Sequence, residues 1–300
     1  MSYTNPSVDE QVNLPQERPL LEFGWMLAAV GLLVIVATVG VSLGAHWLVR
    51  YIPIEYEARL IEVSGVLQAT LEQSAEPSID PDEEQRRQRT QSYLQDLAVR
   101  LMRVNQEDGG FSVTVHLVPD ETVNAFATLG GNIFIYQGLV DKLTTEQGLA
   151  MVLGHEIAHL NQRDPITTLG RGLAFRIVLT LLTGVAEQGA ATAVLEASGG
   201  SLLLSFGRDQ ERAADAAALT GLTKLYGHTQ GADEFFEYIA GDAGDELVEL
   251  PVFLQTHPGI KERRRHIEAY ARANDAPGAN ARSVAGGPTP LPGFVKSPQE

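Results

Sequence analysis

One long stretch near the N-terminus contains no charged residue, and it constrains the fold more than any other feature. The stretch runs from Phe23 to Val49. A helix of about 20 apolar residues spans a bilayer, and Trp25, Trp47 and Tyr51 lie near its two ends, as interface aromatics do. A cleaved signal peptide is the alternative, but the stretch is too long and its leading segment is acidic. The sequence therefore predicts a single-pass membrane protein.

Composition divides the chain into five segments. We expect a flexible N-terminal tail over residues 1–22, a transmembrane anchor over 23–49, a juxtamembrane helix and linker over 50–79, the main folded domain over 80–273 and a disordered C-terminal tail over 274–300. The last segment is rich in Pro, Gly, Ala and Ser, which disfavours a packed core. Helical periodicity with a few alternating stretches predicts an α+β fold class for the folded domain, mainly helical with a small β-sheet.

The overall charge and the absence of cysteine narrow the kinds of partner. The formal net charge is −16, and an acidic surface repels phosphates, so we expect no nucleic-acid partner. With no cysteine in the chain, thiolate ligands are excluded. Any bound metal must therefore use His, Asp or Glu.

Two helix starts carry capping signals. Asp80 is the expected N-cap of one helix, with Pro81 at its first position and Glu83 three residues after the cap. Thr144 is the expected N-cap of a second, long helix, with Gln147 completing a capping box. Between these helices, residues 111–118 alternate as a strand does, and residues 124–137 predict two short strands or one strand bent at the Gly130–Gly131 pair.

The second of these helices carries the pattern His155-Glu156-Ile-Ala-His159. Histidines at i and i+4 lie on one side of a helix, so both imidazoles face one point, where they can bind zinc. Glu156 follows the first histidine, where a carboxylate reaches a metal-bound water without ligating the metal. The alternative is a solvated helix face, but the flanking residues are apolar. Polar side chains on the buried side of a helix cost free energy unless they have a partner, which a metal would supply.

A catalytic zinc site needs a third protein ligand. Residues 205–216 look helical and carry Glu211 and Asp215 one turn apart. Glu211 would complete a His-His-Glu set, and Asp215 would accept a hydrogen bond from a ligand imidazole. An acidic solvated face is the competing interpretation, and it is strongest for Asp209.

Four separated motifs together resemble one family. They are NAFATLGG at 124–131, HEIAH at 155–159, RDQERAAD at 208–215 and Thr256-His257-Pro258. Over about residues 90–270, their order and spacing are similar to the HtpX-like and CAAX-prenyl-protease-like membrane-associated zinc metallopeptidases. The resemblance implies a gluzincin, with a zincin-like metallopeptidase domain over 80–273, and favours the single-anchor bacterial type.

The resemblance also implies roles for individual residues. His155, His159 and Glu211 would bind one zinc ion per chain, and Glu156 would act as general base. Asp215 would support a ligand, and Arg263 would pair with an acid such as Asp215. His257 would lie beside the site, where it either donates to the substrate oxyanion or covers the metal in a resting state.

The same resemblance implies a peptide or protein substrate. The segment formed by Asn124, Ala125, Phe126 and Ala127 would be an edge strand next to the bound peptide. The implied function is that of a membrane-anchored zinc endopeptidase in membrane or envelope protein quality control. We expect a bacterial inner-membrane location with the catalytic domain on the periplasmic side, although the few basic residues beside the anchor favour the cytoplasm.

Two alternative functions stay open at the level of sequence. A membrane-tethered chaperone or adaptor could use the zinc domain to hold clients, although intact Glu156 argues against it. A zinc hydrolase acting on a non-peptide amide is a second alternative.

Residues 171–206 depart from multi-span members of the family, and we interpret them as a buried or membrane-facing hairpin that could touch the bilayer or gate the site. Gly40 and Gly44 form a weak G-x-x-x-G signal for a homo-oligomer.

Overall fold

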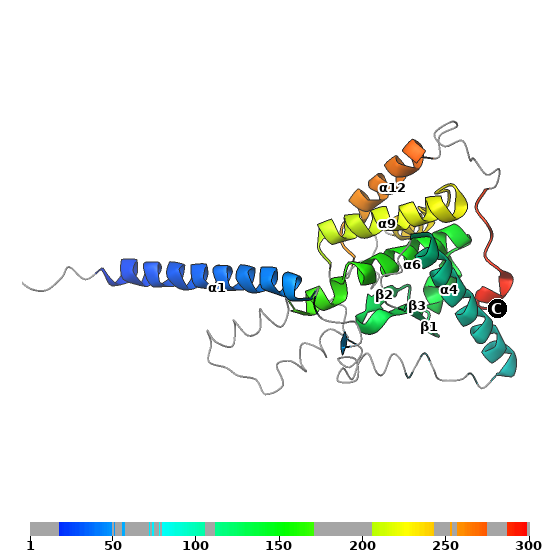
Figure 1. The fold of residues 1–300 in the computed structure, drawn as a ribbon, viewed down its shortest axis with the longest axis horizontal. Helices are drawn as coiled ribbons and strands as arrows, with labels where there is room; N and C mark the ends of the chain where they lie inside the picture. The colour runs from blue at the N-terminus through cyan, green and yellow to red at the C-terminus, as the bar shows by residue number, and fades with distance from the viewer. Residues whose placement is uncertain are drawn as a thin grey trace, which may run out of the picture.

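The computed structural model describes residues 18–49, 51, 56–57, 72, 74, 78, 80–105, 112–170, 206–242, 253, 257–274 and 287–298. The described part is mostly helical, with one three-stranded sheet (Figure 1). The α+β fold class predicted from the sequence is therefore confirmed. Most of the expected juxtamembrane helix and the expected 171–206 hairpin lie outside the described residues.

The stretch predicted to be the membrane anchor forms a single helix, α1 (Pro19–Val49), which extends away from the rest of the molecule (Figure 1). Its described side chains are exposed or half-buried all round, and it lacks the polar face of a domain helix. By length and composition, it is the one candidate membrane span among the described residues. Association through Gly40 and Gly44 stays a prediction.

The first helix of the folded domain, α4 (Pro81–Asn105), begins at the predicted cap. Asp80 Oδ1 accepts a hydrogen bond from the N–H of Asp82 at 2.9 Å. Glu83 does not complete the predicted capping box, because its carboxylate accepts from the Ser78 hydroxyl instead. The helix buries one face, formed by Thr90, Leu94, Leu97, Ala98 and Leu101.

The sheet contains β1 (Thr114–Val118), β2 (Ala125–Thr128) and β3 (Asn132–Tyr136) in the order β1-β3-β2. β3 is parallel to β1 and antiparallel to β2, so β2 is an edge strand. The turn between β2 and β3 passes through Gly130 and Gly131, whose φ values of 69° and 81° favour glycine. The prediction of two short strands meeting at this glycine pair is confirmed.

After the short α5 (Gln137–Lys142), the long helix α6 (Glu146–Asn161) begins one residue later than predicted. Its N-cap is Thr145, whose hydroxyl accepts from the N–H of Gly148 at 3.0 Å. The prediction of Thr144 was wrong: both threonine hydroxyls donate to Glu234, but the one that also accepts from the first turn of α6 is that of Thr145. The predicted box with Gln147 is also absent, since its side-chain oxygen accepts from Thr289 at 2.8 Å.

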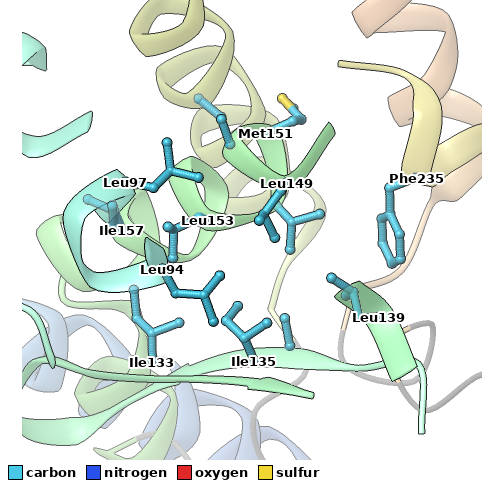
Figure 2. Close-up of a cluster of buried hydrophobic side chains, with 14 of the residues drawn as sticks. Leu94, Leu97, Ile133, Ile135, Leu139, Leu149, Met151, Leu153, Ile157 and Phe235 are labelled. Carbon is cyan, nitrogen blue, oxygen red and sulfur yellow. The ribbon is translucent and has the colours of Figure 1, made fainter. Parts of the chain in front are cut away.

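Helix α9 (Arg208–Tyr226) packs against α6, and α10 (Glu234–Asp242) and α12 (Ile260–Asn274) follow it in the chain. The contact is close at Gly154, where an added Cβ would lie 3.4 Å from the Cα and Cβ of Ala218. Apolar side chains from α4, β3 and α6 meet between the helices and the sheet (Figure 2). This core sets the relative positions of α6, α9 and the sheet.

Residues 287–298, here called the strap, differ from the expected disordered tail. Val295 is fully buried, and Pro290 forms a β-bridge with Thr145. The N–H of Glu146 donates to the carbonyl of Thr289 at 2.8 Å. The strap packs on the domain because these main-chain groups find partners there, despite a composition typical of disorder.

Candidate metal centre

Four side chains from three parts of the chain converge on one buried point. His155 and His159 lie one turn apart on α6, Glu211 lies on the first turn of α9, and His257 lies just before α12. One potential ligand atom from each lies within 4.8 Å of the other three. All four residues are buried.

The spacing of these atoms suits a tetrahedral zinc ion. Ligand atoms at about 2.0–2.1 Å from zinc, at tetrahedral corners, lie about 3.3 Å from one another. The Nε2 atoms of His155 and His159 are 3.0 Å apart, and each lies 3.5–3.6 Å from an oxygen of Glu211. The Nδ1 atom of His257 lies 3.3 Å from His155 Nε2 and 3.0 Å from Glu211 Oε1. The residues present therefore fit the metal.

Two buried carboxylates orient the two imidazoles of α6. Nδ1 of His155 lies 2.9 Å from Asp215 Oδ1, and Nδ1 of His159 lies 2.8 Å from Asp164 Oδ2. A carboxylate beside Nδ1 accepts a hydrogen bond from the Nδ1–H of a neutral imidazole, which leaves the Nε2 lone pair free for a metal. Both Nε2 lone pairs then face the same point.

The pKa values of the two histidines shift in opposite directions. Burial lowers the pKa of His155, and the nearby Arg263 guanidinium lowers it further. Burial also opposes the charged form of His159, but its bonds to Asp164 and Glu211 outweigh burial and raise its pKa. The two facing imidazoles therefore differ in how readily they bind a proton.

Arg263 bonds both buried acidic residues of α9, Asp215 and Glu211. Its Nε and Nη2 atoms donate to the two oxygens of Asp215 at 2.8 and 2.7 Å, and its Nη1 atom lies 2.7 Å from Glu211 Oε2. Burial opposes ionisation of Asp215, but Arg263 outweighs it and holds the pKa of that carboxyl below its usual range. Glu156, Glu211 and Asp215 are three buried acids whose charges act on this one guanidinium, a balance that favours a divalent cation.

Glu156 is fully buried and only half satisfied. Its Oε2 atom accepts from the N–H of Ala127 on β2 at 2.7 Å. Its Oε1 atom has no hydrogen-bond partner among the described residues, and lies 3.6 Å from His257 Nε2, which has none either. Buried polar atoms without partners are uncommon and mark places where a ligand or water is accepted.

The expected peptide-binding segment, residues 124–127, overlaps β2 (Ala125–Thr128). The N–H of Tyr136 donates to the carbonyl of Asn124 at 3.1 Å, so in this antiparallel pair the main-chain groups of Phe126 also face β3. Those of Ala125 and Ala127 face the opposite side, toward α6. The Asn124 Oδ1 atom is buried without a partner in the described part of the chain.

Four residues near the metal centre were not singled out in the sequence. Asp164 bonds His159 and also accepts from Gln210 Nε2 at 2.5 Å, so it links the end of α6 to the start of α9. The Phe206 ring stacks on His159, and the Phe253 ring stacks on His257. Asp164 could have been found as an acid five residues after a ligand histidine, whereas the two rings carry no signal beyond hydrophobicity.

The fold and this donor set define a zinc metallopeptidase. Residues 84–271, which are 188 of the 300 residues, match the sequence profile of peptidase family M48. The chain therefore belongs to the M48 family of zinc metalloproteases.

Curated relatives agree with this assignment. The chain is 26% identical to the mitochondrial metalloendopeptidase OMA1 of Schizosaccharomyces pombe over 260 residues, which cover 83% of this chain and 72% of that protein. It is 26% identical to the metalloprotease YcaL of Escherichia coli over 182 residues, covering 60% and 70%. It is 28% identical to the beta-barrel assembly-enhancing protease of the same bacterium over 195 residues, covering 61% of this chain but only 38% of that protein.

Proposed function

We propose that this protein is a membrane-anchored zinc endopeptidase in which His155, His159 and Glu211 bind the metal and Glu156 is the general base. One observation carries the proposal. The Nε2 atoms of the two α6 histidines and the Glu211 carboxylate face one point, and the unpartnered oxygen of Glu156 belongs to the same buried cluster. A purely structural zinc site has no use for that oxygen.

The chemistry follows from the donor set. When bound, zinc supplies Lewis acidity that polarises the scissile carbonyl and acidifies a water. Glu156 takes the proton of the attacking water through Oε1, as the water oxygen adds to the carbonyl carbon. Glu156 then passes this proton to the leaving amine as the C–N bond breaks. The N–H of Ala127 keeps Glu156 oriented by holding its other oxygen.

The substrate peptide would lie along β2. Ala125 and Ala127 direct their main-chain groups away from β3, so a peptide can add there as a further strand. Because the N–H of Ala127 is already bonded to Glu156, the N–H and carbonyl of Ala125 and the carbonyl of Ala127 are the main-chain groups that would pair with a peptide. Residues Asn124 to Ala127 would thus align the scissile bond with the base.

For His257, the spacing favours the covering role over oxyanion donation. Its Nδ1 atom is as close to His155 Nε2 and Glu211 as those ligand atoms are to one another, which is the place of a fourth ligand. In that arrangement, His257 must withdraw before water and substrate enter. A His257→Ala protein should keep its zinc and cleave faster than wild type, whereas slower cleavage with zinc retained would assign the oxyanion role.

The cellular role we propose is protein quality control at a bacterial inner membrane, by a single-anchor enzyme of the HtpX-like type. Support comes from the candidate span α1 and from the names of two relatives, which refer to a mitochondrial endopeptidase and to β-barrel assembly. We place the catalytic domain on the periplasmic side. Digestion by external protease after permeabilising only the outer membrane tests this, and full protection of the domain would reverse the orientation.

The central test pairs metal analysis with peptide cleavage. Glu156→Gln removes the base but no ligand, so we expect zinc to stay bound while cleavage falls by about 10²–10⁴-fold. His155→Ala removes a ligand, so we expect loss of both zinc and cleavage. Elemental analysis and a quenched-peptide assay measure the two quantities, with chelated wild type as the control. Cleavage retained by the Glu156→Gln protein would refute the assignment.

A further inference from the structure

A carboxylate that follows the membrane anchor is buried in the catalytic domain. Glu57 comes eight positions after Val49, the last residue of α1, and is only 3% exposed. Eight extended residues span at most about 28 Å, so the end of the anchor lies within that reach of the Glu57 site. The connection between bilayer and catalytic domain is therefore short and has a defined point of attachment.

The two oxygens of Glu57 bind two different turns. Oε2 accepts from the N–H of Gly130 at 3.1 Å, and Oε1 forms an ion pair with Arg163 Nη2 at 2.5 Å. Burial raises the pKa of Glu57, while the bonds from Gly130 and Arg163 oppose that rise. A buried carboxylate is costly without such partners, so the attachment depends on both turns.

The Gly130 turn leads to the general base. Gly130 lies in the turn that follows β2, and Ala127, three residues earlier, donates its N–H to Glu156. With φ of 69° at Gly130, the direction of its N–H is set by a tight turn with little freedom. A shift of this turn therefore moves the strand that orients Glu156.

The Arg163 turn leads to the ligand helix. Arg163 follows the end of α6 and precedes Asp164, which bonds the ligand His159. It has φ of 60°, a left-handed conformation that a non-glycine residue keeps only where its surroundings impose it. The carbonyl of Arg163 also accepts from the N–H and hydroxyl of Thr167, and the ion pair with Glu57 holds its side chain.

We propose that Glu57 is a positioning residue that couples the membrane anchor to the active site. It holds the turn after the peptide-binding strand and the turn after the ligand helix in one arrangement. The inference rests on the proposed function, because it assigns catalytic meaning to both turns. It predicts that the anchor segment contributes to turnover as well as to tethering.

The experiment uses the full chain in detergent micelles and four variants. Glu57→Gln keeps an oxygen for the Gly130 N–H and removes the charge that pairs with Arg163. Arg163→Gln and the double variant complete a cycle, and Glu121→Gln, an exposed acid in the loop before β2, is the matched control. Quenched-peptide kinetics, zinc content, thermal unfolding and amide hydrogen exchange are measured for each.

We expect Glu57→Gln to lower kcat/KM by about ten- to a hundredfold through kcat, with zinc content unchanged. Amide exchange should become faster in peptides covering residues 127–131 and 160–167. The double variant should lose little more than either single variant, because the two changes remove the same ion pair. Glu121→Gln should match wild type in all four measurements.

Two results would overturn the inference. One is exchange in both regions equal to that of the Glu121→Gln control. The other is a lower unfolding temperature with kcat of the folded protein unchanged, which would mean a structural role alone. Wild-type protein that binds zinc but cleaves no peptide would instead refute the proposed function, while the exchange measurement would still test the contact.

Discussion

Helix α6 carries one glutamate at its N-terminal end and another toward its C-terminal end, and the two differ in how many of their oxygens are hydrogen-bonded. At the N-terminal end, Glu146 accepts from Arg100 Nη1 at 3.0 Å and from the hydroxyls of Tyr226 and Tyr93 at 2.7 and 2.5 Å, so both oxygens are bonded. Toward the other end, Glu156 accepts one hydrogen bond and keeps one buried oxygen without a partner among the described residues. A fully bonded carboxylate stabilises a fold, whereas a half-bonded one is available for chemistry.

Helix α9 connects the N-terminal end of α6, where Glu146 is fully bonded, to the metal centre near the other end of α6. Tyr226, at the end of α9, bonds Glu146 at the start of α6, while Glu211, at the start of α9, faces His155 and His159. The two helices are therefore antiparallel, and the Glu146 network fixes one end of the pair. Because the helices approach closely at Gly154, this fixed end sets where Glu211 arrives.

Among the substitutions that test this difference between the two ends of α6, we expect the largest effect, a loss of zinc affinity, at Asp164 beside His159. Asp164→Asn keeps the size of the side chain but weakens the acceptor for His159 Nδ1. Removing such an orienting carboxylate typically lowers metal affinity about 10–100-fold, and we expect a loss in that range. Competition with a fluorescent zinc chelator measures it.

The matched control for Asp164 is Asp209, an exposed acid on the first turn of α9. Asp209→Asn should leave zinc affinity unchanged. Equal affinities of the Asp164→Asn and wild-type proteins would show that the contact with His159 plays no part in holding the metal.

Local patterns explain which parts of this site could be predicted from the sequence. The apolar helix α1, the HEIAH helix and the glycine pair between β2 and β3 depend on residues close together in the chain, so periodicity and turn chemistry indicate them. Glu211 could be predicted as the third ligand because a catalytic zinc site needs one and few acidic residues lie on a helix face that is expected to be buried. The fold class followed from the same periodicities.

Long-range pairing explains what could not be predicted. The hydroxyls of Thr144 and Thr145 both donate to Glu234, far along the chain, and no local pattern shows which of the two threonines also caps α6. The strap was predicted to be disordered from its composition, yet Val295 is buried because the domain offers partners to its main chain. No local pattern shows that Gln210 would reach Asp164 across two helix ends.

The smallest expected change lies at the bonded end of α6 and tests whether its glutamate is structural. Glu146→Gln removes the charge that Arg100 and the two tyrosines bind, and we expect unfolding free energy to fall by about 1–3 kcal/mol, with zinc affinity and kcat unchanged. Glu121→Gln, an exposed acid, should shift it by less than about 0.5 kcal/mol. Denaturant unfolding of the zinc-loaded protein measures the difference.

The pH dependence of this difference separates charge from packing. Burial alone would raise the pKa of Glu146, but bonds from Arg100, Tyr93 and Tyr226 outweigh burial and lower it below its usual range. A group whose folded pKa is lowered contributes stability above its unfolded pKa and loses it as pH falls through the folded value. The gap between wild type and Glu146→Gln should therefore be full at neutral pH and shrink below about pH 4.3. If the difference in unfolding free energy between wild type and Glu146→Gln stays constant as the pH falls, side-chain shape and not charge stabilises this end of α6. The bonded charge of Glu146 would then not distinguish it from Glu156, and only the burial of the two side chains would differ.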